Sequence, residues 1–186
     1  MAVEKRKQAL LDAASELLAI NPTASLAEIA AHANIGKATL HRYFASRDDL
    51  ILALGFRAIE MIGQAIVAAK LEEGTVSEAL TRLMDGLIPL ADKVYFMLSE
   101  PSVNYNADLT EAERLVSLPV ENLVERGQAS GELRADLPKE WLLHVLDYLL
   151  YATWHAVYIG ELAKRDATPL LLTTFLQGFG SRDSPT

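Results

Sequence analysis

Residues 25–53 read SLAEIAAHANIGKATLHRYFASRDDLILA and decide the fold of the amino-terminal part of the chain. Apolar residues at helical spacing predict one helix over residues 26–33 and another over residues 37–44. The segment between them, Ala33-Asn34-Ile35-Gly36, is too short to join two stacked helices and suits a sharply angled helix-turn-helix. Asn34 also tolerates the left-handed backbone conformation that a tight turn needs.

A small apolar core is predicted for a three-helix head around this turn. A helix expected over residues 4–19 supplies one apolar stripe, and the two helices of the turn supply the other faces. The side chains predicted to meet are Leu10, Leu11, Ala14, Leu17, Leu18, Leu26, Ile29, Ala30, Ile35, Leu40 and Phe44. We therefore expect a helix-turn-helix domain over residues 1–46 and a larger helical body over residues 47–186.

The outward side of residues 37–44 is unusual for a solvated helix, because it is cationic, hydroxylated and aromatic without an acidic residue. It carries Lys37, Ala38, Thr39, His41, Arg42 and Tyr43. Lys and Arg can donate to guanine edges, and Thr, His and Tyr can donate to phosphates. Arg47, beside the amide-rich start of the next helix, adds a phosphate site. A short basic helix can also be a merely solvated face, and composition alone does not choose between the two interpretations.

Composition and charge fit an all-α globular protein. Of the 186 residues, 51% are hydrophobic and 23% charged, which favours a folded chain over a disordered one. Ala and Leu outnumber the β-branched residues, and the absence of cysteine excludes disulfide scaffolds and thiol catalysis. The net charge of −8 argues against diffuse nucleic-acid binding. Residues 1–50 hold six basic and six acidic side chains, which leaves room for a small basic face.

Capping signals mark the helix starts along the chain. Ser or Thr followed three residues later by Glu or Asp can satisfy two free amides reciprocally. This spacing occurs at Ser25/Glu28, Ser46/Asp49, Thr75/Glu78 and Thr110/Glu113, and Thr168-Pro169 and Asp136 with Pro138 predict two further starts. We expect nine helices, over residues 4–19, 26–33, 37–44, 47–71, 76–90, 93–100, 110–128, 138–162 and 169–179.

The quoted stretch resembles the amino-terminal signature of the TetR (tetracycline repressor) family of bacterial transcriptional regulators. The matching positions are Ala30, Ile35, Thr39, Leu40, His41, Tyr43, Phe44, Arg47 and Leu50. A weaker match lies at residues 127–133, GQASGEL, which resembles the turn that ends the family's seventh helix. Two positions depart from the pattern, since Asn34 replaces the turn glycine and Gly36 replaces the usual Ser or Thr cap.

The resemblance implies a sequence-specific DNA-binding regulator, most simply a repressor that a small apolar or aromatic ligand releases from a palindromic operator. It makes Lys37 the leading base-reading residue, with Arg42 second. His41 and Tyr43 then contact phosphates, joined by Thr39, Arg47 and the Ser25 hydroxyl. The alternative is a member of the same fold that organises the nucleoid or binds a partner protein without an inducer.

The helix expected over residues 138–162 has no ordinary solvent face. One arc is aliphatic and small, and the other is aromatic with His144, Asp147 and His155. Such a helix must be covered on both sides, so we expect a homodimer through a four-helix bundle, as the resemblance also implies. The interface residues predicted are Leu142, Leu149, Ala152, Ala156, Gly160, Leu171, Phe175 and Gly178, although which arc faces the partner stays open.

The aromatic arc has two interpretations, a well-packed core or the wall of a ligand chamber. The chamber residues predicted are Met61, Leu83, Leu87, Tyr95, Phe96, Met97, His144, Asp147, Tyr148, Tyr151 and Trp154. A buried Asp147 would need a cationic ligand or a structural partner such as His144. Gly55 and Gly63 lie in the helix expected over residues 47–71. They are either positions where this helix can bend during a conformational change or positions where another helix packs closely against it.

Catalysis, a cofactor and a membrane span are not expected. His144 and Asp147 lie one helical turn apart while His155 lies almost three turns beyond His144, so one metal ion cannot join them. No phosphate-binding glycine loop, HExxH or nucleophile elbow occurs in the sequence. The stretch Trp141–Gly160 has the length of a bilayer span, but Asp147 lies in it at a cost of about 2.5–3.5 kcal/mol. Without a signal peptide, a cytoplasmic and nucleoid-associated location is expected.

Overall fold

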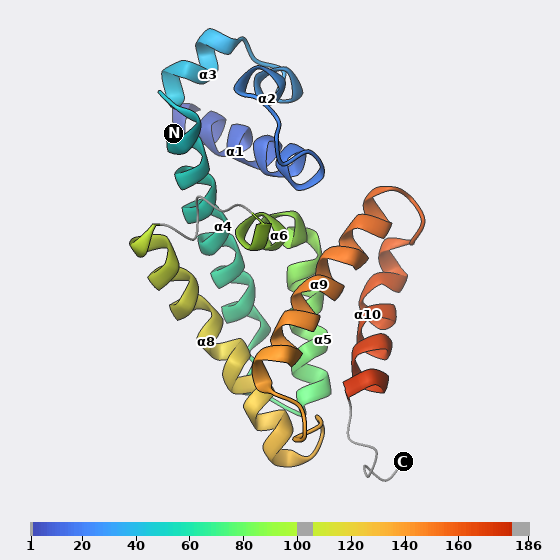
Figure 1. Ribbon diagram of the computed structural model, residues 1–186. Helices are drawn as coiled ribbons and strands as arrows, with labels where there is room; N and C mark the ends of the chain where they lie inside the picture. Colours follow the sequence, from blue (N-terminus) through green and yellow to red (C-terminus); the bar gives the residue numbers. More distant parts are fainter. Residues whose placement is uncertain (1, 100–105, 180–186) are drawn as a thin grey trace. The chain divides into compact units, whose positions relative to one another are not determined.

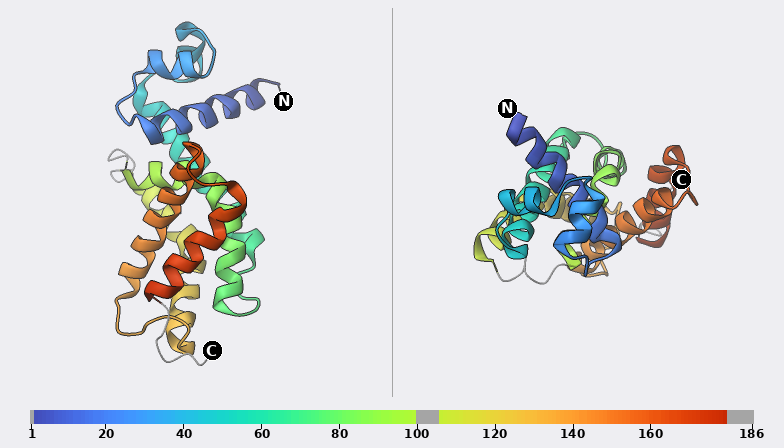
Figure 2. Two further views of the ribbon diagram at one scale, coloured as in Figure 1. Left: turned by 90° about the vertical axis from the view of Figure 1, so that its right-hand side faces the viewer. Right: turned by 90° about the horizontal axis from the view of Figure 1, so that it is seen from above.

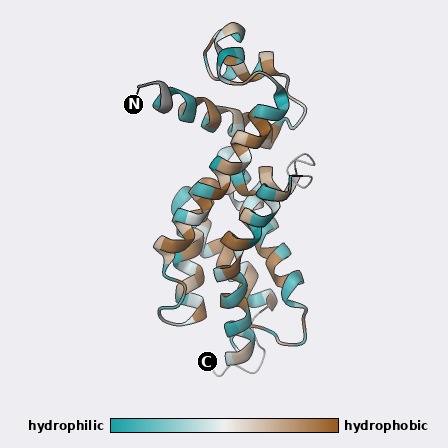
Figure 3. Cartoon of the chain, turned by 90° about the vertical axis from the view of Figure 1, so that its left-hand side faces the viewer, coloured by the Kyte–Doolittle hydropathy of each residue, from teal (hydrophilic) through white to brown (hydrophobic). Residues whose placement is uncertain are grey.

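The computed structural model describes residues 2–99 and 106–179, and helices are the regular elements of these residues. The elements are α1 (Ala2–Ile20), α2 (Leu26–His32), α3 (Lys37–Tyr43), α4 (Arg47–Ala69), α5 (Val76–Leu87), the 3-10 helix η1 (Ile88–Leu90), α6 (Ala91–Ser99), α8 (Ala107–Ser130), α9 (Lys139–Tyr158) and α10 (Lys164–Phe179) (Figure 1). Each of the nine ranges expected from the sequence overlaps an observed α-helix. The all-α prediction is therefore confirmed, and hydrophobic and hydrophilic segments alternate along the helices as amphipathic packing requires (Figure 3).

Packing divides the chain into two compact units. The first unit comprises Met1–Met61 and Asp92–Glu113, and the second comprises Ile62–Ala91 and Arg114–Thr186. Helices α4 and α8 each contribute residues to both units. The boundary expected between residues 46 and 47 separates two functions, DNA binding and the binding of a ligand or partner, whereas the two units are defined by packing. The functional boundary therefore stays a prediction.

The turn between α2 and α3 has the backbone that the sequence predicts. Asn34 has a φ of 55°. Its amide donates to the Ala31 carbonyl (3.0 Å), and the Ile35 amide donates to the Ala30 carbonyl (2.9 Å). These two bonds close the end of α2 in the manner of a Schellman motif, in which the left-handed residue is usually glycine. Asn34 thus takes the left-handed position that glycine usually occupies in this motif.

The core of the head is close to the predicted one. Ala14, Ile29 and Leu40 are fully buried, and Leu10, Leu11, Leu18, Ala30 and Phe44 are nearly so. Ile35 is only half-buried, as are Leu17 and Leu26, so these three lie at the edge of the core.

Three of the predicted capping boxes form, and two predicted helix starts are wrong. The Ser25/Glu28, Ser46/Asp49 and Thr75/Glu78 pairs each make reciprocal backbone-to-side-chain bonds. Helix α8 begins at Ala107, where Asn106 accepts from the Leu109 amide (3.0 Å), so Thr110 lies inside the helix. Helix α10 begins at Lys164, and Pro169 therefore lies within it. The Thr168 hydroxyl donates to Asp85 instead of capping a helix.

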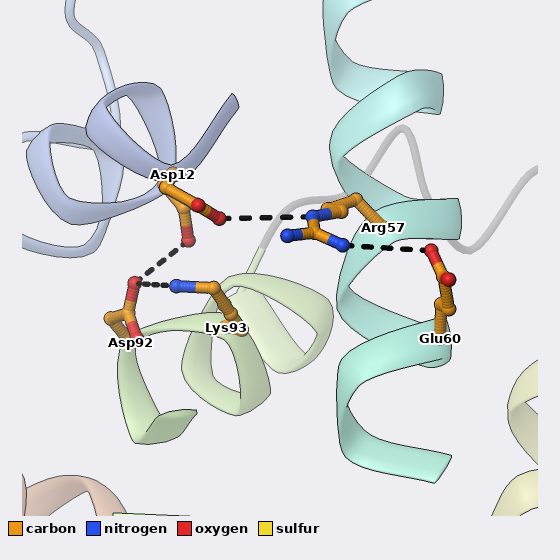
Figure 4. A network of polar contacts seen from close by, with 6 residues as sticks. Asp12, Arg57, Glu60, Asp92 and Lys93 are labelled. Carbon is orange, nitrogen blue, oxygen red and sulfur yellow. Dashed lines mark hydrogen bonds and ion pairs between the residues drawn. The ribbon is translucent and has the colours of Figure 1, made fainter. Parts of the chain in front are cut away.

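A polar network ties α1, α4 and α6 together inside the first unit (Figure 4). The Ser15 hydroxyl donates to Asp92 (2.9 Å), and the same carboxylate oxygen accepts from Lys93 (3.0 Å). Asp92 and Lys93 are 2% and 7% exposed. Nearby, Arg57 lies 3.8 Å from Asp12 and 3.6 Å from Glu60. Because buried charges are costly unless paired and hydrogen-bonded, this network fixes which faces of the three helices meet.

Both glycines of α4 are close-packing sites. A Cβ on Gly55 would lie 3.0 Å from the Leu109 side chain, and one on Gly63 would lie 2.8 Å from Val116. Both distances are shorter than ordinary carbon contacts. Close packing of α4 against α8 therefore accounts for these glycines, and a role as bending points of the helix is not needed to explain them.

In the second unit, α9 and α10 lie side by side and run in opposite directions (Figure 2). The guanidinium group of Arg82 binds the chain at the end of α4, where it donates to the carbonyls of Ala69, Lys70 and Glu73 at 2.6–2.9 Å. The last turn of α8 and the turn that follows it each require a glycine. A Cβ on Gly127 would lie 2.7 Å from Leu133, and Gly131 has a φ of +78°.

By length and composition α4 could also cross a membrane. Its most apolar 18-residue window has a mean hydropathy of 1.7, and 33% of that window is buried within the protein. A helix from the core of a water-soluble protein meets the same criterion, so this property says little about location. Among the described helices, the criterion is met by α4 and not by the stretch Trp141–Gly160 that the sequence singles out.

Candidate functional site

Helix α3 presents a basic face to solvent. Leu40 points inward and is fully buried, whereas Lys37, Ala38, His41 and Arg42 are exposed. Within the described residues, Lys37 and His41 make no hydrogen bond or ion pair. Their donors are therefore available to an external acceptor, as a base-reading or phosphate-binding role requires.

The aromatic and basic groups beside this face are held in place by contacts within the head. The Arg42 guanidinium carbon lies 5.8 Å from the centre of the Tyr43 ring. The Lys7 ammonium lies 5.7 Å from the centre of the Phe44 ring, which brings a cation of α1 next to the end of α3. Cation–π contacts of this kind orient long side chains before any partner binds. Thr39 and Tyr43 are half-buried at the flank of the face.

Two of the predicted phosphate contacts are already engaged. Arg47 donates to the Pro22 carbonyl (3.1 Å) and is half-buried. The Ser25 hydroxyl donates to Glu28 (2.7 Å), and hydrogen bonds from the Ser25 side chain and amide hold the pKa of Glu28 below its ordinary value. An anionic Glu28 beside Ser25 repels a phosphate. Of the predicted contacts, Ser25 is therefore the one that this geometry favours least.

A second candidate site is a cleft in the second unit, with a volume of about 490 Å³. It is lined by Asp85, Ile88, Pro89, Trp154, Val157, Tyr158, Lys164, Ala167 and Thr168. The Trp154 and Tyr158 rings stack with their centres 5.3 Å apart, and Tyr151 lies 5.8 Å from Trp154. The sequence predicts Trp154 as a ligand residue. It places Tyr158 on the same aromatic arc without naming it as a ligand residue, and it misses Asp85 and Lys164, because only the fold brings α5, α9 and α10 to one place.

The other predicted chamber residues are spread over the two units. Tyr95, Phe96, Met97 and Met61 belong to the first unit, and the remainder to the second. In the second unit Leu83 and Leu87 are buried, Asp147 and Tyr151 are half-buried, and His144 and Tyr148 are exposed. His144 Nδ1 lies 2.6 Å from the Glu140 carbonyl of the preceding helical turn. A chamber formed by the whole set stays a prediction.

The exposed face of α9 shows which of its arcs is free to meet a partner. Trp141, Tyr148 and Ile159 are 55%, 56% and 48% exposed, and they recur at helical spacing with exposed Ala152 between them. On α10, Leu170 is 52% exposed. These exposed apolar side chains on α9 and α10 are the candidates for a contact with a partner.

This exposure corrects the predicted dimer contacts. Leu142, Leu171 and Phe175 are at most 1% exposed within the single chain, so they belong to its own core and their assignment to the interface is wrong. Gly160 has a φ of +82° and ends α9, because the Gly160 and Glu161 amides donate to the Val157 and Ala156 carbonyls. The predictions for Ala152, Leu149, Ala156 and Gly178 stay open, since these residues are exposed or half-buried.

The fold and the basic face of α3 define a class of protein, the DNA-binding helix-turn-helix regulators. Comparison with known proteins narrows the class. Residues 10–54 match the model of the family described as bacterial regulatory proteins, tetR family. The chain is 31% identical over 175 residues to the HTH-type transcriptional repressor LfrR of Mycolicibacterium smegmatis, covering 94% of this chain and 90% of LfrR.

Two further similarities extend over the same length. The HTH-type transcriptional regulator NfxB of Pseudomonas aeruginosa is 27% identical over 180 residues, which cover 96% of each chain. The crystal structure of the TetR-like regulator LfrR from Mycobacterium smegmatis in complex with proflavine superposes with a TM-score of 0.77 at 29% identity, covering 96% of this chain and 98% of LfrR. This chain belongs to the TetR family and is a DNA-binding transcriptional regulator. The family consists of regulators, which is consistent with the expected absence of catalysis.

Proposed function

We propose that this protein is a repressor that binds an inverted-repeat operator as a homodimer and leaves it when a planar aromatic ligand binds. The observation that carries the proposal is the exposed face of α3, where Lys37, His41 and Arg42 offer donors within a helix-turn-helix whose first helix starts with a capping box. In this proposal Lys37 reads a base, Arg42 assists it, and Thr39, His41, Tyr43 and Arg47 contact phosphates, whereas Ser25 is left out because its hydroxyl is bound to the anionic Glu28. Regulation by DNA binding places the protein in the bacterial cytoplasm, at the nucleoid.

The exposed apolar face of α9 and α10 supports the homodimer. A stable interface needs about 800 Å² from each partner, and two long helices with exposed Trp141, Tyr148, Ile159 and Leu170 can supply it. A two-fold symmetric pair carries two copies of α3, and copies about 34 Å apart contact successive major grooves on one side of the duplex. Dimerisation therefore explains why the operator should be a palindrome.

The release mechanism rests on α4, which contributes to both compact units. A ligand releases DNA only if it binds the conformation that does not bind DNA more tightly. Moving the population from mostly bound to mostly free takes about 5.5 kcal/mol of differential affinity. The relative LfrR has been crystallised with proflavine, a planar aromatic cation, and this supports the class of ligand proposed here.

The test starts from an operator enriched from random duplexes by the protein itself. Proflavine is then titrated into the complex of protein and labelled operator, and the fraction of DNA bound is followed by electrophoretic mobility shift. We expect release by proflavine and no release by glycerol at the same concentration. If proflavine and a panel of neutral, anionic and zwitterionic aromatic compounds all leave the complex intact, the ligand-independent alternative replaces this proposal.

A further inference from the structure

The cleft of about 490 Å³ in the second unit carries a combination of groups that neither DNA binding nor dimerisation uses. The end of α5, the element η1, the end of α9 and the start of α10 supply its walls. Small-molecule sites have volumes of about 300–1,000 Å³, so the cleft is large enough for a compound of two or three fused rings.

One wall of the cleft is aromatic. Trp154 and Tyr158 are stacked with an interplanar angle of 24° and are part of a run of rings on α9 that also includes Tyr151. Ile88 and Pro89 of η1 add aliphatic surface to the same cleft. A flat aromatic guest gains offset stacking on such a wall in addition to the burial of apolar area.

The charged groups of the cleft are the Asp85 carboxylate and the Lys164 ammonium, which form no ion pair with each other. Asp85 accepts a hydrogen bond from the Thr168 hydroxyl through Oδ1 (2.5 Å). This bond fixes the carboxylate and leaves Oδ2 for another donor. Lys164, at the first residue of α10, makes no hydrogen bond or ion pair with any described residue. Asp85 and Lys164 therefore offer two opposite charges, each able to bind a group of a ligand.

We propose that this cleft binds a planar aromatic zwitterion, with its amine on Asp85, its carboxylate on Lys164 and its ring on Trp154 and Tyr158. A compound with only one charged end satisfies one residue and places its neutral end beside the other charge. The proposal specifies the ligand of the proposed function and rests on it only in assuming that a ligand binds to the body of the protein. Binding to the free protein, without DNA, tests it separately.

The experiment uses three naphthalene compounds that differ only in their charged groups. Aminomethyl-naphthoic acid, with the two groups at opposite ends of the ring system, is the zwitterion; naphthoic acid is the anion; and naphthylmethylamine is the cation. Their dissociation constants for the full-length protein are measured by isothermal titration calorimetry at neutral pH. We expect the zwitterion to bind about tenfold more tightly than either single-charge compound, which is the effect of one additional charge-assisted hydrogen bond.

Two variants assign the charges of the cleft, a third is their control, and a fourth tests the aromatic wall. Asp85→Asn keeps an acceptor for Thr168 and should weaken the zwitterion and the cation about tenfold while leaving the anion unchanged. Lys164→Gln should weaken the zwitterion and the anion and leave the cation unchanged. Arg165→Gln is the matched control, because Arg165 is the next residue and lies outside the cleft, and it should change none of the three. Trp154→Leu should weaken all three compounds.

The proposal is overturned if the zwitterion binds no more tightly than the cation or the anion. It is also overturned if Lys164→Gln and Arg165→Gln weaken binding equally. The preference for a compound with a carboxylate would then come from the general positive charge of this region and not from a contact with Lys164. The thermal unfolding midpoint of each variant is measured beside the titrations. If Asp85→Asn unfolds at a lower temperature than the wild type, Asp85→Ser is used in its place. Release of operator by a compound that fails to bind this cleft would leave the proposed function standing and this inference overturned.

Discussion

The side chains on the exposed face of α3 differ in the contacts that they can make. Lys37 is exposed and Tyr43 is half-buried at the flank, and in the proposed function the Lys37 ammonium contacts a guanine edge while the Tyr43 hydroxyl contacts a phosphate. Base contacts carry sequence information, and phosphate contacts position the protein equally on every sequence. The two residues should therefore fail in different ways when they are changed.

Lys37→Ala should relax the preference at one base position of each half-site by about 1–3 kcal/mol. Tyr43→Phe should weaken binding to all duplexes by a similar factor, because it removes only a phosphate donor. Competition mobility-shift assays against single-base variants of the selected operator measure both effects. An unchanged discrimination profile for Lys37→Ala would contradict its assignment as the base-reading residue.

The capping carboxylates give the protein a pH dependence at the residue scale. The amide and hydroxyl of Thr75 hydrogen-bond to Glu78 and hold its pKa below the ordinary value of 4.5. A carboxylate with a lowered pKa stabilises the folded state above the pKa of the unfolded chain, and this stabilisation is lost as the pH falls through the folded-state pKa. The wild type should therefore be more stable than Glu78→Ala at pH 7, with a difference that starts to shrink below about pH 4.5.

Urea unfolding midpoints measured from pH 7 down to pH 3 follow this difference. Glu72→Ala is a suitable control, because Glu72 is exposed and caps no helix. A gap between the wild type and Glu78→Ala that stays constant over the whole range would show that the Glu78 charge contributes nothing through its hydrogen bonds.

At the scale of helices, the network around Asp92 determines how α1 and α6 pack in the first unit. Ser15 is 4% exposed and is the hydroxyl donor of the Asp92 carboxylate. Ser15→Ala should destabilise the protein by about 1–3 kcal/mol, because a buried carboxylate loses a partner. Ser77→Ala, at an exposed site on α5, should change the free energy of unfolding very little. Equal urea midpoints for the two variants would contradict a structural role for the network.

The positions of the helices follow from the sequence because their signals are local. Apolar periodicity and the Ser25/Glu28, Ser46/Asp49 and Thr75/Glu78 pairs act within one or two turns, and all three capping boxes form. Thr168-Pro169 misleads because the same pair can start a helix or lie inside one. Its hydroxyl is engaged by Asp85, which is 83 residues away.

Features that depend on distant parts of the chain could not be predicted in this way. The sequence predicts Trp154 as a ligand residue but not the cleft, since Asp85 and Lys164 reach it only through the packing of α5 and α10. It also leaves open which arc of α9 faces a partner. The same small apolar residues serve equally well in the subunit core, where Leu142 lies, and at an interface.

At the scale of the whole molecule, the exposed apolar face of α9 should hold two chains together. Sedimentation velocity at micromolar concentration should give twice the 20.4 kDa chain mass. Tyr148→Asp should weaken this dimer by at least about tenfold, because a charge is desolvated at the interface. Val67→Asp is the matched control, since Val67 is 77% exposed on α4, outside this face. A monomeric wild type, or equal effects of the two variants, would contradict the proposed interface.

DNA recognition by α3 is the claim on which the proposed function depends. Its most direct measurement is the ratio of affinities for a selected inverted repeat and for a scrambled duplex of the same composition, by fluorescence anisotropy at moderate salt. Two α3 helices reading two half-sites predict a ratio of at least about 10³. They also predict that the ratio falls sharply when one half-site is scrambled. Equal affinity for the repeat and the scrambled duplex would contradict the account.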